Sequence, residues 1–206
     1  METLSKARVV VLASGRGSNF EALAKAVSSH ELSRVAITGL ICNVPQAGAL
    51  SVAARYAIPS FLIPSEHQEK NWIRSRYEAA LLAQLKTLAP DWICLAGYML
   101  LLGPSIVREY PKKILNIHPS LLPKFPGLKA QRQALEAKER ETGCTVHWVT
   151  EGLDEGPILL QKRISILPGD TEHSLSERLL TVEHQTYVEA LRLLTEPTGH
   201  LKNHPQ

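Results

Sequence analysis

The chain has 206 residues, of which 44% are hydrophobic and 21% charged, a composition that predicts one globular domain, with or without a smaller lobe. Its 23 basic and 20 acidic residues leave a net charge of +3, and the basic residues are scattered along the chain. These features argue against a nucleic-acid partner but permit a small anionic ligand, which needs only a local positive site.

The first part of the chain alternates short apolar runs with stretches of helical periodicity. Strands are predicted at residues 8–13, 35–41, 58–63, 92–96 and 114–117, and helices at residues 19–27, 46–56 and 72–88. Strands that alternate with helices, and that are as continuously apolar as residues 9–12, indicate burial on both sides. We therefore predict an α/β fold, with a doubly wound, mostly parallel sheet and helices on both of its faces.

The pattern changes after residue 140. Residues 145–150 and 158–166 predict two strands with a glycine-containing connection, so we expect an antiparallel C-terminal addition to the sheet. Residues 174–194 predict a final long helix. The remaining residues are polar and include prolines, which is typical of a frayed tail.

The cysteines and the apolar runs indicate where the protein functions. Cys42, Cys94 and Cys144 are odd in number, form no Cys-x-x-Cys pair and lie in or beside apolar segments, so they are interpreted as buried free thiols. The first residues lack a secretory apolar region, and no apolar stretch approaches the roughly 20 residues that a membrane helix needs. We expect a cytoplasmic protein with no membrane partner.

A glycine-containing turn, Ser14-Gly-Arg-Gly-Ser-Asn19, lies between the first predicted strand and the first helix. Such a turn presents backbone N–H groups and a helix N-terminus to an anion. Phe20 occupies the third glycine position of the dinucleotide fingerprint, and the lysine of a Walker loop is absent. The turn is either a phosphate site or only a tight corner, and the side chains of Ser18 and Asn19 favour the phosphate site.

Asn116 and His118 are two residues apart in a predicted strand that Pro119 ends. They should therefore project from the same face, where an amide donor beside an imidazole suits chemistry that builds negative charge on a carbonyl oxygen. The alternative is a capping asparagine and a structural histidine. The position at the carboxyl end of a parallel strand favours catalysis, as does Asp154 on a later glycine-flanked loop. The other histidines show no metal-ligand spacing, so no metal is expected, and they are interpreted as surface or structural residues. His147 is set apart from the rest because its strand leads toward Asp154.

Several motifs in this order resemble those of the folate-dependent phosphoribosylglycinamide formyltransferases, over residues 9 to 191. They are Ser14-Gly-Arg-Gly-Ser-Asn19, Leu95-Ala-Gly-Tyr-Met99, Leu115-Asn-Ile-His-Pro-Ser-Leu-Leu-Pro-Lys-Phe-Pro-Gly127, Gly143-Cys-Thr-Val-His147, Leu153-Asp-Glu-Gly-Pro157, and Gly169-Asp-Thr with Glu183-His184. The resemblance implies transfer of a formyl group from 10-formyltetrahydrofolate to the amine of glycinamide ribonucleotide, in purine synthesis.

The resemblance also implies roles for individual residues. Asn116, His118 and Asp154 would be catalytic, through a tetrahedral intermediate stabilised by the first two while Asp154 assists proton transfer. The implied substrate contacts are Gly17, Ser18 and Asn19 at the phosphate and Glu183 at the ribose hydroxyls. The implied folate contacts are Arg74 at the glutamate tail and Tyr98, Met99, Leu100, Leu101, Leu102, Val107 and Val149 at the pterin. Residues 120–141 would form a mobile loop over the site.

On this basis residues 1–206 are expected to be a single formyltransferase domain. Residues 8–110 would be its phosphate-binding half, residues 111–195 its catalytic and folate-binding half, and residues 196–206 its tail. The expected partners are small molecules, with no nucleic acid, and the protein would be a monomer or a homodimer.

Two positions depart from the family pattern. Leu100 stands where the family usually has arginine, which would weaken folate binding if the arginine side chain is used and change little if only its backbone is used. Val188 replaces a common proline, and we expect this change to affect packing.

Three other functions compete with this one. Formyltetrahydrofolate hydrolase uses a related Asn-x-His and Asp site with water as acceptor, but an amino-terminal regulatory domain would be expected there. Methionyl-tRNA formyltransferase carries an added RNA-binding domain. A non-catalytic nucleotide-binding module would not need Asn116, His118 and Asp154 together.

Overall fold

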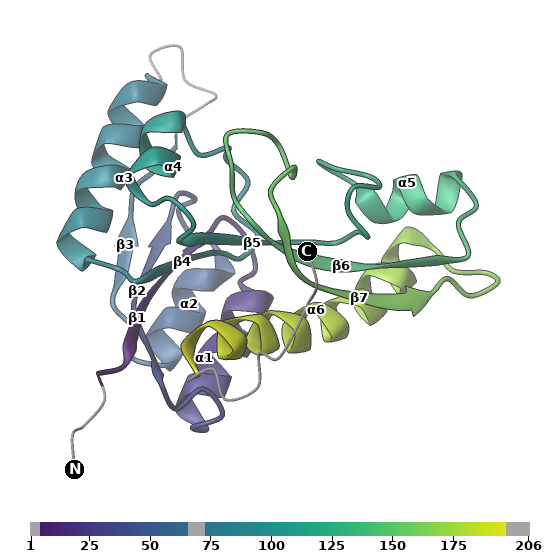
Figure 1. The fold of residues 1–206 in the computed structure, drawn as a ribbon, viewed down its shortest axis with the longest axis horizontal. Coiled ribbons are helices and arrows are strands. Elements are labelled where there is room, and N and C mark those ends of the chain that lie inside the picture. Colours follow the sequence, from purple (N-terminus) through teal and green to yellow (C-terminus); the bar gives the residue numbers. More distant parts are fainter. Residues whose placement is uncertain (1–4, 66–72, 197–206) are drawn as a thin grey trace.

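The computed structural model describes residues 5–65 and 73–196 (Figure 1). The elements follow in the order β1 (Ala7–Ala13), α1 (Ser18–Ser28), β2 (Val35–Cys42), α2 (Gly48–Arg55), β3 (Ser60–Leu62), α3 (Arg74–Leu88), β4 (Trp92–Leu95), α4 (Pro104–Glu109), β5 (Ile114–His118), α5 (Ala130–Glu136), β6 (Glu141–Trp148), β7 (Ile158–Ser165) and α6 (Glu172–Thr195). The predicted start of the third helix at Trp72 and residues 197–206 of the predicted tail lie outside the described residues.

The strands form one sheet in the order β3-β2-β1-β4-β5-β6-β7. Strands β1 to β5 pair in parallel, whereas β6 pairs antiparallel with both β5 and β7. The predicted fold class, including the antiparallel C-terminal addition, is therefore confirmed. In Figure 1, β6, β7 and α5 extend away from the parallel part of the sheet.

Alternate residues of the central strands pack against helices on opposite faces, as the period of a strand requires. Val9 and Val11 of β1 belong to a core shared with α1, α2 and α6, whereas Val10 and Leu12 belong to a core shared with α3 and α4. Buried Tyr187 of α6 donates a hydrogen bond that is shared by the carbonyl oxygens of Leu95 and Leu115, 3.0 and 3.2 Å away. The long last helix thus holds β4 and β5 in place at its centre.

The strand order reverses between β1 and β4, because the chain builds outward from β1 through β2 to β3 and then returns to the other side of β1. In open α/β sheets, the connections that leave adjacent strands at such a point diverge to opposite faces and leave a crevice at the carboxyl edge. The turn after β1 and the segment after β4 border this crevice, and the end of β5 lies next to it.

Two short helices were not predicted. Helix α4 spans 6 residues and α5 spans 7, too few for a periodic pattern to develop. The segment 120–141, expected to form a mobile loop over the site, thus contains a helix at Ala130–Glu136. Strand β6 also begins at Glu141, four residues before the predicted strand, because its polar first residues pair with β7.

The three cysteines are buried and free, as predicted. Within residues 5–65 and 73–196, the structure contains no helix that is both long and apolar enough to cross a bilayer.

Candidate active site

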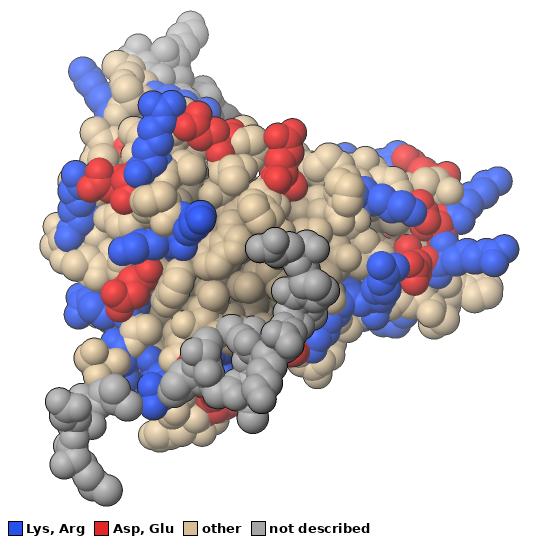
Figure 2. Space-filling view, viewed as in Figure 1, with Lys and Arg blue, Asp and Glu red and all other residues tan. Residues whose placement is uncertain are grey.

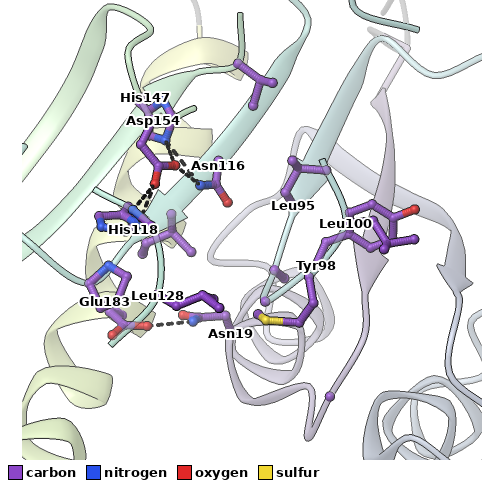
Figure 3. Close-up of a pocket in the computed structure, with 18 of the residues that line it drawn as sticks. Asn19, Leu95, Tyr98, Leu100, Asn116, His118, Leu128, His147, Asp154 and Glu183 are labelled. Atoms are coloured by element: carbon purple, nitrogen blue, oxygen red, sulfur yellow. Dashed lines mark hydrogen bonds and ion pairs between the residues drawn. The ribbon is translucent and has the colours of Figure 1, made fainter. Parts of the chain in front are cut away.

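A cavity of about 720 Å³ opens at the crevice, a volume typical of small-molecule sites. Its walls come from segments that are far apart in the sequence (Figure 3). The glycine loop (residues 14–19) and Glu183 form a polar wall, and the apolar segment (residues 95–102) forms the opposite wall. Residues from the end of β5 and from the acid loop (residues 149–157) lie between them.

The glycine loop is shaped by Gly17, which forms the N-cap of α1 with φ of 81°. A side chain there would be strained, and its Cβ would lie 2.7 Å from the Cα of Ala49 at the start of α2. No side chain of the described residues caps the N-terminus of α1, so N–H groups of its first turn remain available at the cavity. Gly17, Ser18 and Asn19 all line the cavity, in a geometry that suits an anion.

Asn19 and Glu183 bring α1 and α6 together at the polar wall. Asn19 Nδ2 donates to Glu183 Oε2 at 2.8 Å, and both side chains are buried. Asn19 Oδ1 is buried as well and has no hydrogen-bond partner among the described residues. Burial raises the pKa of Glu183, although the bond from Asn19 acts in the opposite direction. The pair presents acceptors that suit the hydroxyl groups of a ligand.

Asp154 brings the three predicted catalytic residues together. Its Oδ2 lies 3.3 Å from His118 Nδ1 and accepts a hydrogen bond of 2.9 Å from the peptide N–H of Gly127. Its Oδ1 lies 3.4 Å from Asn116 Nδ2. Asn116, His118 and Asp154 therefore meet at one place, although 38 positions separate the first from the last.

His147 also belongs to this cluster, although the sequence analysis left it among the structural or surface histidines. It is buried, and its Nε2 lies 3.2 Å from Asn116 Nδ2 and 3.5 Å from Asp154 Oδ1. Its Nδ1 must carry a proton, because it donates to the Trp148 carbonyl at 3.0 Å. The signal for this position was the antiparallel register, in which His147 pairs with Asn116.

The protonation of His118 is set by its surroundings. Nε2 lies 2.9 Å from the Phe125 carbonyl oxygen, which can only accept, so this nitrogen carries a proton and Nδ1 is the atom that titrates. Burial lowers the pKa of His118, and this outweighs the Phe125 carbonyl and the Asp154 carboxylate, which raise it. Asp154 thus raises the pKa of His118 without being the dominant influence.

Asp154 itself remains the charged member of the cluster. Burial alone would raise the pKa of its carboxyl group, but His147, the Gly127 N–H and His118 together lower it below its ordinary value. A buried carboxylate keeps its charge only when donors of this kind surround it.

The apolar segment contains most of the predicted folate contacts. Tyr98, Met99, Leu100, Leu101 and Leu102 line the cavity, together with Val149 of the acid loop. Tyr98 is buried and its hydroxyl contacts that of Tyr77, whereas Met99 and Leu101 are 64% and 58% exposed. The predicted contacts Arg74 and Val107 are among the described residues but do not line the cavity. Arg74 reaches its rim by donating to the Leu101 carbonyl at 2.8 Å, and it also pairs with Glu78.

Comparison with known proteins gives consistent results. A model of the formyl transferase family matches residues 7–191. A phosphoribosylglycinamide formyltransferase from Bacillus subtilis is 40% identical over 91% of this chain and 94% of its own length. The trifunctional purine biosynthetic protein adenosine-3 of Drosophila pseudoobscura pseudoobscura is 46% identical, and this chain spans 14% of its length.

Solved structures agree. The crystal structure of glycinamide ribonucleotide transformylase 1 from Symbiobacterium toebii matches this structure with a TM-score of 0.87. The two sequences are 40% identical, and the match covers 92% of this chain and 88% of that one. A formyltetrahydrofolate deformylase from Pseudomonas syringae pv. tomato is 30% identical with a TM-score of 0.83, over 91% of this chain and 61% of that one.

Glu183→Gln is expected to raise the free energy of unfolding near pH 8. Burial raises the pKa of Glu183, so ionising this carboxyl group costs more in the folded than in the unfolded protein. The gain should shrink as the pH falls and vanish below roughly pH 4.3, where the unfolded carboxyl group is also protonated. Urea denaturation from pH 4 to 8 measures this difference.

Glu177→Gln, at an exposed position on the same helix, is the matched control and should show no such gain. A stability difference between Glu183→Gln and the wild type that stayed constant with pH would contradict the raised pKa.

Proposed function

We propose that this chain, which belongs to the formyl transferase family, transfers a formyl group from 10-formyltetrahydrofolate to the amine of glycinamide ribonucleotide. The observation that carries the proposal is the meeting of Asn116, His118 and Asp154 between a polar and an apolar wall of one cavity. A phosphorylated acceptor fits the polar wall and a flat, largely apolar donor fits the opposite one.

The polar wall accounts for the nucleotide. The free N–H groups around Gly17, Ser18 and Asn19 would hold its phosphate, and Glu183 with Asn19 Oδ1 would accept hydrogen bonds from the ribose hydroxyls. This arrangement directs the amine of the acceptor toward Asn116 and His118.

The apolar segment accounts for the folate. Its residues 98–102 and Val149 would enclose the pterin. Arg74 would have to leave Glu78 to reach the glutamate tail, because it already makes an ion pair there. Leu100 adds apolar surface where the family usually has a cation, so pterin burial carries more of the binding in this chain.

The proposed reaction has two steps. The amine nitrogen attacks the formyl carbon, and negative charge develops on the former carbonyl oxygen of the tetrahedral intermediate. The bond from carbon to N10 of the folate then breaks, and N10 takes up a proton while the new amide nitrogen has lost one. The residues of the cluster therefore need to stabilise an oxyanion and move one proton.

Asn116 is the proposed oxyanion donor. Its Nδ2 hydrogens point to His147 Nε2 and Asp154 Oδ1, and Figure 3 shows the amide oxygen turned away from both. The 3.4 Å contact with Asp154 is long for a hydrogen bond, so this hydrogen is the one that can turn to the substrate oxygen. Losing such a donor typically costs about 10²–10³ in rate.

His118 and Asp154 are the proposed proton carriers. The titrating Nδ1 of His118 faces Asp154, so a proton that leaves the amine through an ordered water can be stabilised between them. The imidazolium formed in this way would also stabilise the oxyanion. Because burial favours the neutral ring before reaction, His118 is ready to accept this proton.

Hydrolysis of the same donor is the second candidate, since the fold also resembles a formyltetrahydrofolate deformylase. The glycine loop favours transfer, because a phosphate site serves a phosphorylated acceptor and has no use when the acceptor is water. The higher identity to the Bacillus subtilis formyltransferase, 40%, points the same way.

The surface fits small-molecule substrates. On the face shown in Figure 2, basic and acidic side chains are interspersed around the periphery, and the hollowed centre is mostly uncharged. A nucleic-acid partner would be expected to meet a continuous basic stripe. A cytoplasmic location fits the three buried free thiols.

The first test is acceptor dependence. Incubation with 10-formyltetrahydrofolate should release tetrahydrofolate only when glycinamide ribonucleotide is present, and a spectrophotometric folate assay measures this. Equal release without the acceptor would identify a hydrolase instead.

The second test addresses the cluster. His118→Ala and Asp154→Asn are each expected to lower kcat by about 10²–10⁴, because each removes part of the proton path, with much smaller changes in KM. His173→Ala, at an exposed histidine that lies beside Glu177 on α6, is the control and should keep normal turnover. Near-normal turnover in either cluster variant would rule out the role assigned to that residue.

The third test addresses the glycine loop. Ser18→Ala with Asn19→Ala should raise the KM for glycinamide ribonucleotide and leave that for the folate nearly unchanged, because the phosphate meets this loop alone. Ser29→Ala, just after the other end of α1, is the control. Equal weakening of both substrates would argue against a phosphate site.

A further inference from the structure

Three parallel strands end side by side near the cavity, and their register decides which residues meet there. Ala13 at the end of β1 pairs with Cys42 at the end of β2, so the next residues, Ser14 and Asn43, are neighbours. On the other side, Leu12 pairs with Leu95, and the Ser14 N–H donates to the Gly97 carbonyl at 3.1 Å. Ser14 therefore stands between the β2 and β4 connections.

Side chains join these connections into one chain of hydrogen bonds. The peptide N–H of Met99 donates to Ser14 Oγ at 2.8 Å, and Ser14 Oγ donates to Asn43 Oδ1 at 2.6 Å. Asn43 Nδ2 in turn donates to Ser65 Oγ at 2.7 Å, beyond β3. Asn43 is 2% exposed and Ser14 is 7% exposed, so water cannot readily replace these partners.

This chain of bonds lies behind the cavity. Neither Asn43 nor Ser14 is among the described residues that line it. Gly15, which follows Ser14 in the chain, and Met99, whose N–H donates to Ser14 Oγ, do line it. The glycine loop begins at Ser14, and Met99 carries the first exposed side chain of the apolar segment. One hydroxyl group thus fixes the start of both walls relative to each other.

We propose that Asn43 is a positioning residue that, through Ser14 Oγ, fixes the Met99 peptide and so sets the spacing between the phosphate-binding and pterin-binding walls. The proposal rests on the function proposed above. Asn43 orients the Ser14 hydroxyl by accepting a hydrogen bond from it, which leaves a lone pair of the Ser14 oxygen directed at the Met99 N–H. Without this acceptor the hydroxyl can rotate, and the Met99 peptide loses its fixed partner.

The test compares Asn43→Ala, the smaller side-chain change Ser14→Ala, and the double variant. Amide hydrogen exchange at Met99, followed by NMR, should be about 10-fold faster in each variant, because a buried acceptor is lost or released. In the formyl-transfer assay, KM for 10-formyltetrahydrofolate should rise by about 10-fold while kcat changes much less. If Asn43 acts through Ser14, the double variant should be no worse than Ser14→Ala.

Asp91→Ala is the matched control, because Asp91, just before β4, joins β4 to β1 at the edge of the sheet opposite the cavity. Its Oδ2 accepts from the Arg8 N–H at 2.8 Å. Asp91→Ala should leave both Met99 exchange and KM unchanged, even if the protein loses stability.

The outcomes separate this inference from the proposed function. Wild-type protein without acceptor-dependent transfer would refute the function, and the inference with it. With an active wild type, unchanged Met99 exchange in Asn43→Ala and Ser14→Ala would overturn the inference. So would faster exchange with unchanged KM, or additive effects in the double variant.

Discussion

The buried carboxylate of Asp154 is the group on which the arrangement of the site depends. A charge with so little exposure is costly unless donors surround it, and here the amide of Asn116 at the end of β5 and the peptide N–H of Gly127 lie against it, with the imidazoles of His118 and His147 beside them. Satisfying one carboxylate therefore fixes these segments relative to one another. The proposed catalytic geometry and the electrostatics of the cavity have the same origin.

Burial shifts the pKa values of the titratable groups in the cavity and so decides which of them are charged. It raises the pKa of Glu183 and lowers that of His118, so it favours the neutral form of both. Asp154 has enough donors to overcome burial and remains charged. Negative charge is thus concentrated beside a neutral imidazole, an arrangement suited to receiving a proton during the reaction and releasing it afterwards.

The two walls of the cavity follow from sheet topology. Because the connections after β1 and β4 leave toward opposite faces, a helix N-terminus and an apolar segment come to border the same crevice. Their spacing depends on side chains behind the cavity, at Ser14 and Asn43, which touch neither proposed ligand. The proposed substrate contacts thus depend on a layer of buried hydrogen bonds beneath them.

The sequence by itself determined the alternation of strands and helices, the presence of the late strands, the glycine turn and the placement of Asn116 and His118 on one strand, because these depend on local periodicity and on residues that are near one another in the sequence. The short helices α4 and α5 were not predicted, because one or two turns carry no periodic signal. Only the tertiary structure decided that His147 joins Asn116 and Asp154, that Asn43 meets Ser14, and that burial outweighs Asp154 in setting the pKa of His118. Strand register and burial are properties of the packed chain, since they arise only when residues distant in sequence exclude water together.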